Sequence, residues 1–206
     1  MSSPAFIPQR LPRYLSQDEL RRFFHVITDL RDRTLFWLIY HHGLRVGEVE
    51  LLRGFDVDLV RVRIVVRRLK GGVSSEQPLF VKTAALLREY LDTDDAGAGE
   101  APLFRGRVGP LRKRQIQSLF ARYRDLSGLN HRFTCHGLRH SIATHLLDAG
   151  LPLEFVQDHL GHQDIRSTSI YARITDRHRA AVFARLETSE WIPQPNSNPP
   201  PQERSA

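Results

Sequence analysis

Apolar residues along most of this chain recur at the three- and four-residue spacing of helices that bury one face. The first such run follows Ser16, whose hydroxyl can cap a helix, and Glu19 three residues later completes a capping box. A second helix is predicted over residues 33–42, with Gly43 at its end. The apolar positions of these two predicted helices are Leu20, Phe23, Phe24, Ile27, Leu35, Phe36, Leu38 and Ile39.

The helical spacing is interrupted by a short β-like region. Residues 59–69 (LVRVRIVVRRL) alternate and are rich in β-branched side chains, which predicts a strand, and residues 77–81 are the predicted returning strand after a turn at 70–72. A loop over 92–110 precedes a basic helix whose apolar stripe is Ile116, Leu119, Phe120, Tyr123 and Leu126. From His136 the pattern is helical almost to Leu186, broken near residues 150–152 and at Gly161. The expected fold class is mostly α with a small antiparallel β-sheet (α+β).

Prolines mark both ends of the chain. Pro4, Pro8 and Pro12 fall in the first dozen residues, and five more fall between positions 193 and 201. We therefore expect an N-terminal arm over residues 1–12, one folded domain over 13–190 and a proline-rich disordered tail over 191–206.

Composition and charge narrow the function classes. The chain has 206 residues, of which 41% are apolar and 26% charged, as in a soluble globular protein. Its net charge of +7 points to a polyanionic partner, most simply nucleic acid. The single cysteine excludes an internal disulfide framework and a multi-cysteine metal site. No apolar run approaches the ~20 residues of a membrane span, and no signal peptide is evident, so a soluble, cytoplasmic location is expected.

Two segments carry arginines suited to phosphate. GLRVGEVELL at 43–52 places Arg45 directly after a helix-ending glycine, where its guanidinium can hold a phosphate near the next helix N-terminus. A surface arginine paired with Glu48 is the alternative for this segment alone. HGLRHSIATHLL at 136–147 places His136 and Arg139 on one face of a helical turn, whereas His140 and His145 are expected to fall elsewhere.

Metal and thiol chemistry fit the second segment poorly. His136 and His140 have the spacing of a helical zinc pair, but no glutamate base lies between them and Arg139 would oppose a cation. Cys135 lacks the arginine that a cysteine phosphatase needs six residues later, where this chain has Ser141. Packing is therefore the expected role of Cys135.

Two further segments complete a set of residues. LGHQDIRSTSIYARI at 160–174 contains His162 and Tyr171, and Lys70 lies on the predicted hairpin turn. Taken singly, the tyrosine fits a half-buried core position and the lysine a solvated turn. Taken with the arginines, they are what metal-free phosphoryl transfer on DNA requires: guanidinium forks for the phosphate, a histidine and a lysine for protons, and a tyrosine hydroxyl as nucleophile.

The order and wording of these segments resemble the tyrosine recombinase (phage integrase) family over about residues 12–186. The resemblance implies Arg45, His136, Arg139 and His162 around the phosphate, Tyr171 as the nucleophile and Lys70 as the hairpin lysine, and Glu48 would support the arginines without reacting. The hairpin reads RRLKGGVSSEQPLFV, so Arg67 and Arg68 remain alternatives to Lys70. Most relatives also carry an N-terminal helical domain, so this chain is expected to be a short, single-domain recombinase or a fragment.

The function implied by the resemblance is site-specific recombination through a covalent 3′-phosphotyrosyl intermediate, for integration, excision or inversion, without a metal or nucleotide cofactor. The implied partners are double-stranded DNA recombination sites, further copies of this chain in a homotetramer on DNA, and accessory DNA-bending or partner recombinase proteins. The source would be bacterial, phage or another mobile element, with the protein at the nucleoid. A type IB topoisomerase shares the chemistry. The main rival is a catalytically inactive DNA-binding regulator with the same fold, and a basic adaptor would explain the charge but none of the motifs.

Overall fold

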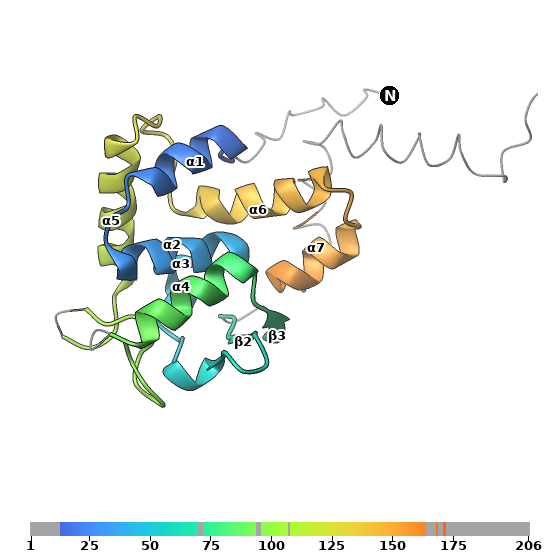
Figure 1. Cartoon of the computed structure of the whole chain (residues 1–206). Helices are drawn as coiled ribbons and strands as arrows, with labels where there is room; N and C mark the ends of the chain where they lie inside the picture. Colours follow the sequence, from blue (N-terminus) through green and yellow to red (C-terminus); the bar gives the residue numbers. More distant parts are fainter. Residues whose placement is uncertain are drawn as a thin grey trace, which may run out of the picture.

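The second helix of the chain lies at the centre of the core. In the computed structural model, which describes residues 13–69, 72–93, 96–106, 108–163, 168 and 171, α2 spans Leu30–His41. The Asp29 side chain caps this helix, because its Oδ1 accepts the N–H of Asp32 at 2.8 Å. The helix therefore starts at residue 30, three residues before the predicted position 33. Side chains on most of its faces are buried, and it packs against α4 (Val81–Leu91) and α6 (His136–Asp148) (Figure 1).

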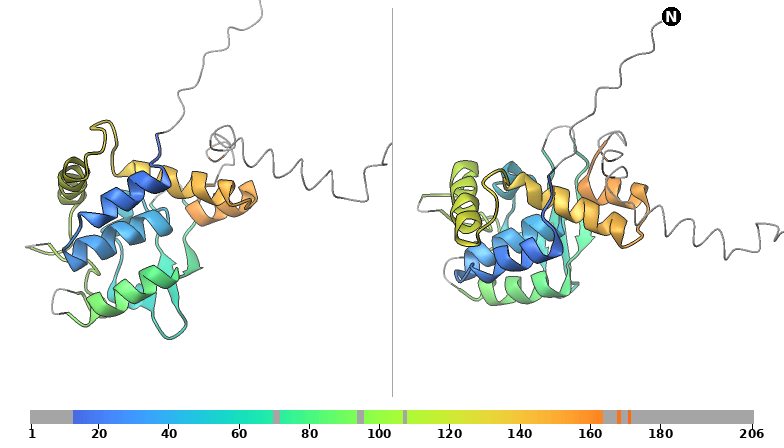
Figure 2. Two further views of the ribbon diagram at one scale, coloured as in Figure 1. Left: turned by 45° about the horizontal axis from the view of Figure 1, so that its top comes forward. Right: turned by 90° about the horizontal axis from the view of Figure 1, so that it is seen from above.

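The first helix begins as predicted. In α1 (Gln17–His25), the Ser16 hydroxyl accepts the N–H of Glu19, and the Glu19 carboxylate accepts the N–H of Ser16 at 2.8 Å. Its Phe23 ring packs on Phe36 of α2 and on Phe120 of α5 (Lys113–Leu126), with ring centroids 5.5 and 5.0 Å apart. The basic helix α5 thus attaches to the core through aromatic contacts and runs across the ends of α1, α2 and α6 (Figure 2). Leu126, predicted on its apolar stripe, is instead 61% exposed in its last turn.

The sheet is smaller than the alternating pattern predicts. Strands β1 (Val57–Asp58), β2 (Arg63–Val66) and β3 (Ser75–Pro78) pair antiparallel in chain order. The predicted strand over 59–69 is wrong at both ends, since β2 covers only 63–66. At its start the Asp58 carboxylate accepts the N–H groups of Val60 and Arg61 and turns the chain. The returning strand likewise lies two residues earlier than the predicted 77 and ends at 78. Hydrogen bonds to the Asp58 side chain therefore determine where the strand starts, although β-branched residues precede that point.

The remaining helices of the described residues are short. They are α3 (Val46–Val49), the 3₁₀ helix η1 (Gly54–Asp56) and α7 (Leu153–Leu160). The breaks at 150–152 and at Gly161 lie where the sequence predicts them, and Gly161 closes α7 with φ +65°. The architecture confirms the α+β prediction.

Several predictions fall outside the described residues. They are the arm over 1–12, the tail over 191–206 and nearly all of the helix expected to reach residue 186. Within the described part of the chain, no helix is long and apolar enough to cross a membrane.

Candidate functional site

The turn after α2 forms the floor of the site. Gly43 adopts φ +55°, and a Cβ atom at this position would lie 2.4 Å from Cδ2 of Leu160 in α7. Glycine is therefore needed both for the left-handed backbone and for the close approach of α7. The Gly43 carbonyl then points at two guanidinium groups, those of Arg68 and Arg139.

Arg45 follows this turn as the N-terminal cap of α3. Its N–H and its Nη1 both donate to the Glu48 carboxylate, at 2.8 and 2.7 Å. The ion pair expected for this segment is thus present, yet the arginine side chain stays 32% exposed and lines a cleft. One carboxylate in the first turn of α3 therefore fixes the direction of an arginine that remains open to a ligand.

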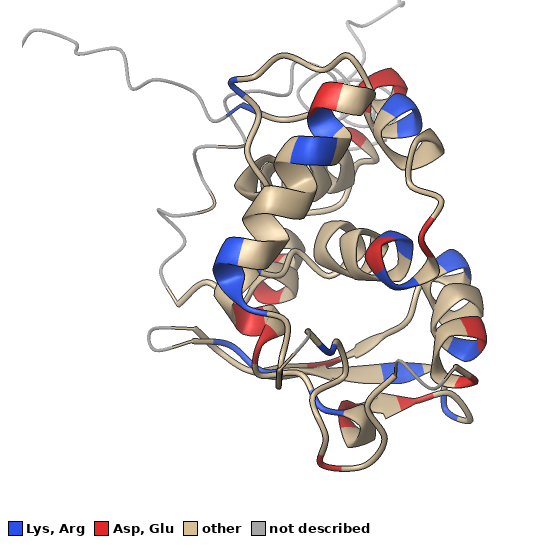
Figure 3. Ribbon diagram, turned by 90° about the vertical axis from the view of Figure 1, so that its left-hand side faces the viewer, with Lys and Arg blue, Asp and Glu red and all other residues tan. Residues whose placement is uncertain are grey.

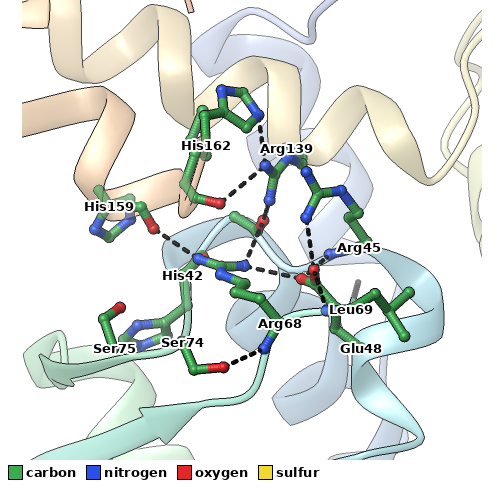
Figure 4. Close-up of polar contacts among 12 residues, drawn as sticks. His42, Arg45, Glu48, Arg68, Leu69, Ser74, Ser75, Arg139, His159 and His162 are labelled. Atoms are coloured by element: carbon green, nitrogen blue, oxygen red, sulfur yellow. Dashed lines mark hydrogen bonds and ion pairs between the residues drawn. The ribbon is translucent and has the colours of Figure 1, made fainter. Parts of the chain in front are cut away.

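Glu48 is a buried counter-charge for more than one arginine. Its other partner is Arg68, whose Nη1 donates to Oε2 at 2.9 Å, and both side chains are fully buried. Burial alone would raise the pKa of Glu48, but the charge of Arg68 and the hydrogen bonds from Arg45 outweigh it and hold that pKa below its ordinary value. The carboxylate is therefore ionised and stays with the arginines (Figure 4).

Arg68 is a residue that the sequence offered only as an alternative to Lys70. The structure gives it a different place, because its guanidinium also donates to the backbone carbonyls of His42 and His159, at 3.1 and 2.6 Å. These contacts tie the hairpin to α2 and α7 across the site. Burial lowers the pKa of Arg68, and the charge of Glu48 opposes that effect. Arg68 is thus a buried residue that connects the hairpin, the end of α2 and α7.

Arg139 lies in the first turns of α6 and is 1% exposed. Its Nη1 donates to the Gly43 carbonyl, and its Nη2 donates to the Leu160 carbonyl at 2.9 Å and contacts Nε2 of His162 at 2.7 Å. Burial, together with the charges of Arg45 and Arg68, lowers the pKa of Arg139 to about 9, so the group is still a cation at neutral pH. Two backbone carbonyls from different elements therefore set the position of this guanidinium.

His162 follows the Gly161 turn, and its protonation follows from its partners. Arginine can only donate, so Nε2 of His162 accepts from Arg139, and Nδ1 carries the proton that is donated to the Thr168 hydroxyl at 2.8 Å. Burial and the neighbouring arginines lower the pKa of His162 to about 4, which keeps the ring neutral. His162 also forms an antiparallel bridge with Gly72 of the hairpin.

Tyr171 reaches the same cluster and is 2% exposed. Burial raises its pKa to about 12, while the charges of Arg139 and Arg45 act in the opposite direction. Its hydroxyl lies 2.7 Å from Nδ1 of His140, which contradicts the expectation that His140 falls away from the site. The sequence could have placed His140 at the site, because its i, i+4 spacing from His136 puts it on the same helix face, one turn further along.

His136 opens toward a cleft beside the cluster. The cleft has a volume of about 560 Å³ and is lined by Arg45 and Leu69, by α5 and by the start of α6. His136 is exposed there, and its ring packs edge-on against His140 with centroids 4.4 Å apart. The protein that surrounds the inner part of its ring partly desolvates it, and this desolvation and the charge of Arg139 lower the pKa of His136. The cleft is basic, because Lys113 and Arg124 of α5 line it together with Arg45, and basic residues lie at both ends of that helix (Figure 3).

The hairpin lysine is not placed. Lys70 lies outside the described residues, although both flanks of the turn are held at the site: the Leu69 N–H donates to Glu48 at 3.4 Å, and Gly72 pairs with His162. The alternative Arg67 is engaged elsewhere, in an ion pair with Asp56 at 2.9 Å. The assignment of Lys70 stays a prediction.

The packing role expected for Cys135 is confirmed, and three other tyrosines also pack in the core. Cys135 is buried, and burial raises the pKa of its thiol to about 12. Tyr40, Tyr90 and Tyr123 are buried with their hydroxyls bonded to His145, to the Leu103 carbonyl and to Asp32. Tyr171 differs from these tyrosines in that the charges of Arg139 and Arg45 act on its hydroxyl.

Comparison with known proteins places this site in context. A model of the phage integrase family matches residues 13–178. The tyrosine recombinase XerA of Thermococcus onnurineus is 36% identical over 189 residues, covering 89% of this chain and 66% of that protein. The chain spans slightly less than two thirds of the length of three archaeal relatives, 66%, 65% and 63%.

Solved structures share the fold. The crystal structure of XerA recombinase matches with a TM-score of 0.73 and 27% identity, over 91% of this chain and 68% of that one. The XerH site-specific recombinase bound to a palindromic difH substrate, in a post-cleavage complex, matches with a TM-score of 0.71 and 25% identity, over 86% of this chain and 54% of that one.

Proposed function

This chain belongs to the phage integrase family, and from that membership we propose that it is a tyrosine-type site-specific DNA recombinase. The observation that carries the proposal is the position of Arg139. Two backbone carbonyls hold its guanidinium next to His162, and its charge and that of Arg45 act on the Tyr171 hydroxyl. A phosphodiester bound among these groups would meet positive charge and a nucleophile together.

The proposed reaction is strand breakage and rejoining without loss of bond energy. The Tyr171 oxygen attacks the scissile phosphorus, a 3′-phosphotyrosyl bond forms, and the 5′-oxygen leaves as a hydroxyl. A 5′-hydroxyl from the partner duplex then attacks and releases the tyrosine. Arg45 and Arg139 stabilise the charge that develops on the non-bridging oxygens, which guanidinium forks can bind bidentately.

The remaining candidate residues divide between phosphate binding and proton transfer. His136, exposed in the cleft, and His162, in contact with Arg139, are assigned to the phosphate. Lys70 is assigned to protonate the leaving 5′-oxygen, and the anchoring of Leu69 and Gly72 at the site supports this role. Glu48 orients the arginines and takes no proton during the reaction.

DNA is the proposed partner, and the basic cleft supports this. Lys113 and Arg124 of α5 line it together with Arg45, in a chain with a net charge of +7. Two solved structures of similar fold are of the XerH site-specific recombinase bound to difH substrate, which supports a recombination site as the partner of this chain. Affinity that rests on phosphate contacts should fall steeply with salt. Recombination joins two duplexes, so we propose that four copies act together on DNA, with accessory DNA-bending or partner recombinase proteins as further partners.

A nicked suicide substrate tests the function. Strand cleavage on such DNA traps the protein covalently, and the adduct is read on a denaturing gel. We expect the wild-type chain to form an adduct and Tyr171→Phe to form none while still binding DNA. Tyr40→Phe is the matched control, because it also removes a hydroxyl bonded to Nδ1 of a histidine on α6.

The same assay separates the proposed enzyme from its rival. A DNA-binding regulator that keeps the fold would bind the substrate and yield no adduct with the wild-type chain. Undiminished adduct from Tyr171→Phe would show that another residue is the nucleophile.

A further inference from the structure

The environment of the nucleophile contains a group with no assigned role. Among the described residues, the hydrogen-bond partner of the Tyr171 hydroxyl is Nδ1 of His140, at 2.7 Å. The two rings lie 5.6 Å apart between centroids and are inclined at 51°. This is the geometry in which a proton on the phenol can pass to the imidazole.

We propose that His140 is a further catalytic residue, whose Nδ1 accepts the phenolic proton as the Tyr171 oxygen attacks the scissile phosphorus. The inference rests on the proposed function, since it concerns the reaction of the same tyrosine. His140 touches the reacting atom itself, whereas Arg45 and Arg139 are assigned to the phosphate.

The surroundings of His140 favour a neutral ring ready to accept a proton. Burial, the neighbouring His136, the cation Arg139 and nearby His162 would all oppose a charge on it, and they lower the pKa of His140 to about 4. Burial raises the pKa of Tyr171 to about 12, so the phenol keeps its proton at neutral pH until a base receives it. A phenol that must lose its proton therefore lies against a ring that can take it.

The proposed step balances. The O–H bond of Tyr171 breaks and its proton moves to Nδ1 of His140, while the oxygen–phosphorus bond forms and the phosphorus–5′-oxygen bond breaks. The leaving oxygen takes a separate proton, assigned above to Lys70. In the rejoining step the 5′-hydroxyl attacks the phosphorus and returns its proton to Lys70, the bond between phosphorus and the tyrosine oxygen breaks, and the departing tyrosine oxygen recovers the proton from His140. The approach of an anionic phosphate offsets the neighbouring positive charge and makes the imidazolium easier to form.

His136 does not fit this role as well. Its ring lines the cleft and packs edge-on against His140, whereas it is Nδ1 of His140 that contacts the Tyr171 hydroxyl. The two histidines, one helical turn apart, therefore act at different points, with His136 at the phosphate and His140 at the nucleophile.

The test compares His140→Asn with His140→Phe in the suicide-substrate assay. Asparagine keeps a hydrogen-bond acceptor near the Nδ1 position but has no proton affinity, so a role limited to positioning would survive it. We expect both variants to bind DNA and to cleave about 100-fold or more slowly at pH 7. His145→Asn is the matched control, since His145 holds Tyr40 in the same way on the same helix and should leave the rate unchanged.

The pH dependence gives a second readout. In the wild-type chain the rate should change little between pH 6.5 and pH 9, whereas in His140→Asn it should rise tenfold per pH unit, because ionisation of the phenol must then come from the solvent. A substrate with a 5′-bridging sulfur, which leaves without a proton, should not rescue His140→Asn. Wild-type rates in His140→Asn, a flat pH profile in that variant, or faster cleavage would each overturn the proposal.

A third measurement needs no variant. Nitrogen-15 NMR of the histidine side chains of the whole chain reports which ring nitrogen carries the proton, and we expect an unprotonated Nδ1 in His140. A protonated Nδ1 would donate to Tyr171 and could not act as its base. The proposed function is tested separately: it fails if Tyr171→Phe still forms the adduct, whereas this inference fails if Tyr171→Phe is inactive and His140→Asn is not impaired.

Discussion

Replacing Glu48 with glutamine tests whether one buried carboxylate holds the site together. The substitution keeps the shape of the side chain and removes its charge. Glu48 receives four donors: Oε1 accepts from Arg45 Nη1 and the Leu69 N–H, and Oε2 accepts from the Arg45 N–H and from Arg68 Nη1. In glutamine, one of these oxygens becomes an NH₂ group, which then faces two donors with a donor of its own.

The magnitude follows from those contacts. A hydrogen bond to a charged group contributes about 1.5–3 kcal/mol, and glutamine loses two of them. Breaking a buried ion pair on one side costs about 3–5 kcal/mol, because the remaining charge, here fully buried Arg68, has no counter-charge. The share of the partly exposed Arg45 is smaller. We therefore expect Glu48→Gln to lower the free energy of unfolding by about 4 kcal/mol.

Urea denaturation at pH 7, followed by circular dichroism, measures this change. Glu76→Gln is the matched control, since Glu76 forms an equally short ion pair with Arg63, at 2.7 Å, but on the surface of the sheet. The control should cost less than about 1 kcal/mol. Adding Arg68→Met should cost less in the Glu48→Gln background than in the wild type, because the pair is already broken. A Glu48→Gln variant within about 1 kcal/mol of the wild type would refute the assignment of Glu48 as the buried counter-charge.

Two further predictions concern the arginines at the phosphate and a pair of buried histidines. Arg45→Lys and Arg139→Lys should each slow cleavage of the suicide substrate by roughly 10²–10³-fold, because lysine cannot bind the phosphate with two parallel N–H groups. His162→Ala should slow cleavage less. An arginine variant that cleaves at nearly the wild-type rate would place that arginine outside the site. The chain should also lose stability in mild acid, because burial lowers the pKa of both His41 and His42 from 6.5 to about 3. Between those values the unfolded chain binds the protons and the folded chain does not, so each ring should remove about 1.4 kcal/mol per pH unit as the pH falls below 6.5, and equal unfolding free energies at pH 7.5 and 5.5 would contradict this.

Local sequence signals determine where several helices of this fold begin and end. The capping box at Ser16 and Glu19 starts α1, and the glycines at 43 and 161 end helices, because each signal acts over a few residues of its own segment. The order of the motifs likewise identified the family, since the residues that make up each motif are neighbours along the chain. The strand predicted over 59–69 starts only at 63, because hydrogen bonds to the Asp58 carboxylate turn the backbone before it, and β-branched composition gives no sign of that turn.

The roles of single residues in the site depended on tertiary contacts. Nothing in the order RRLK distinguishes its two arginines, but the fold buries Arg68 against Glu48 and leaves Arg67 on Asp56. Helical spacing shows that His140 lies one turn beyond His136, yet only the return of the chain after α7 brings Tyr171 to it, across 31 positions of sequence. Local periodicity determines which face of a helix a residue occupies, whereas the partner that meets that face comes from a distant segment and is set by how the elements pack.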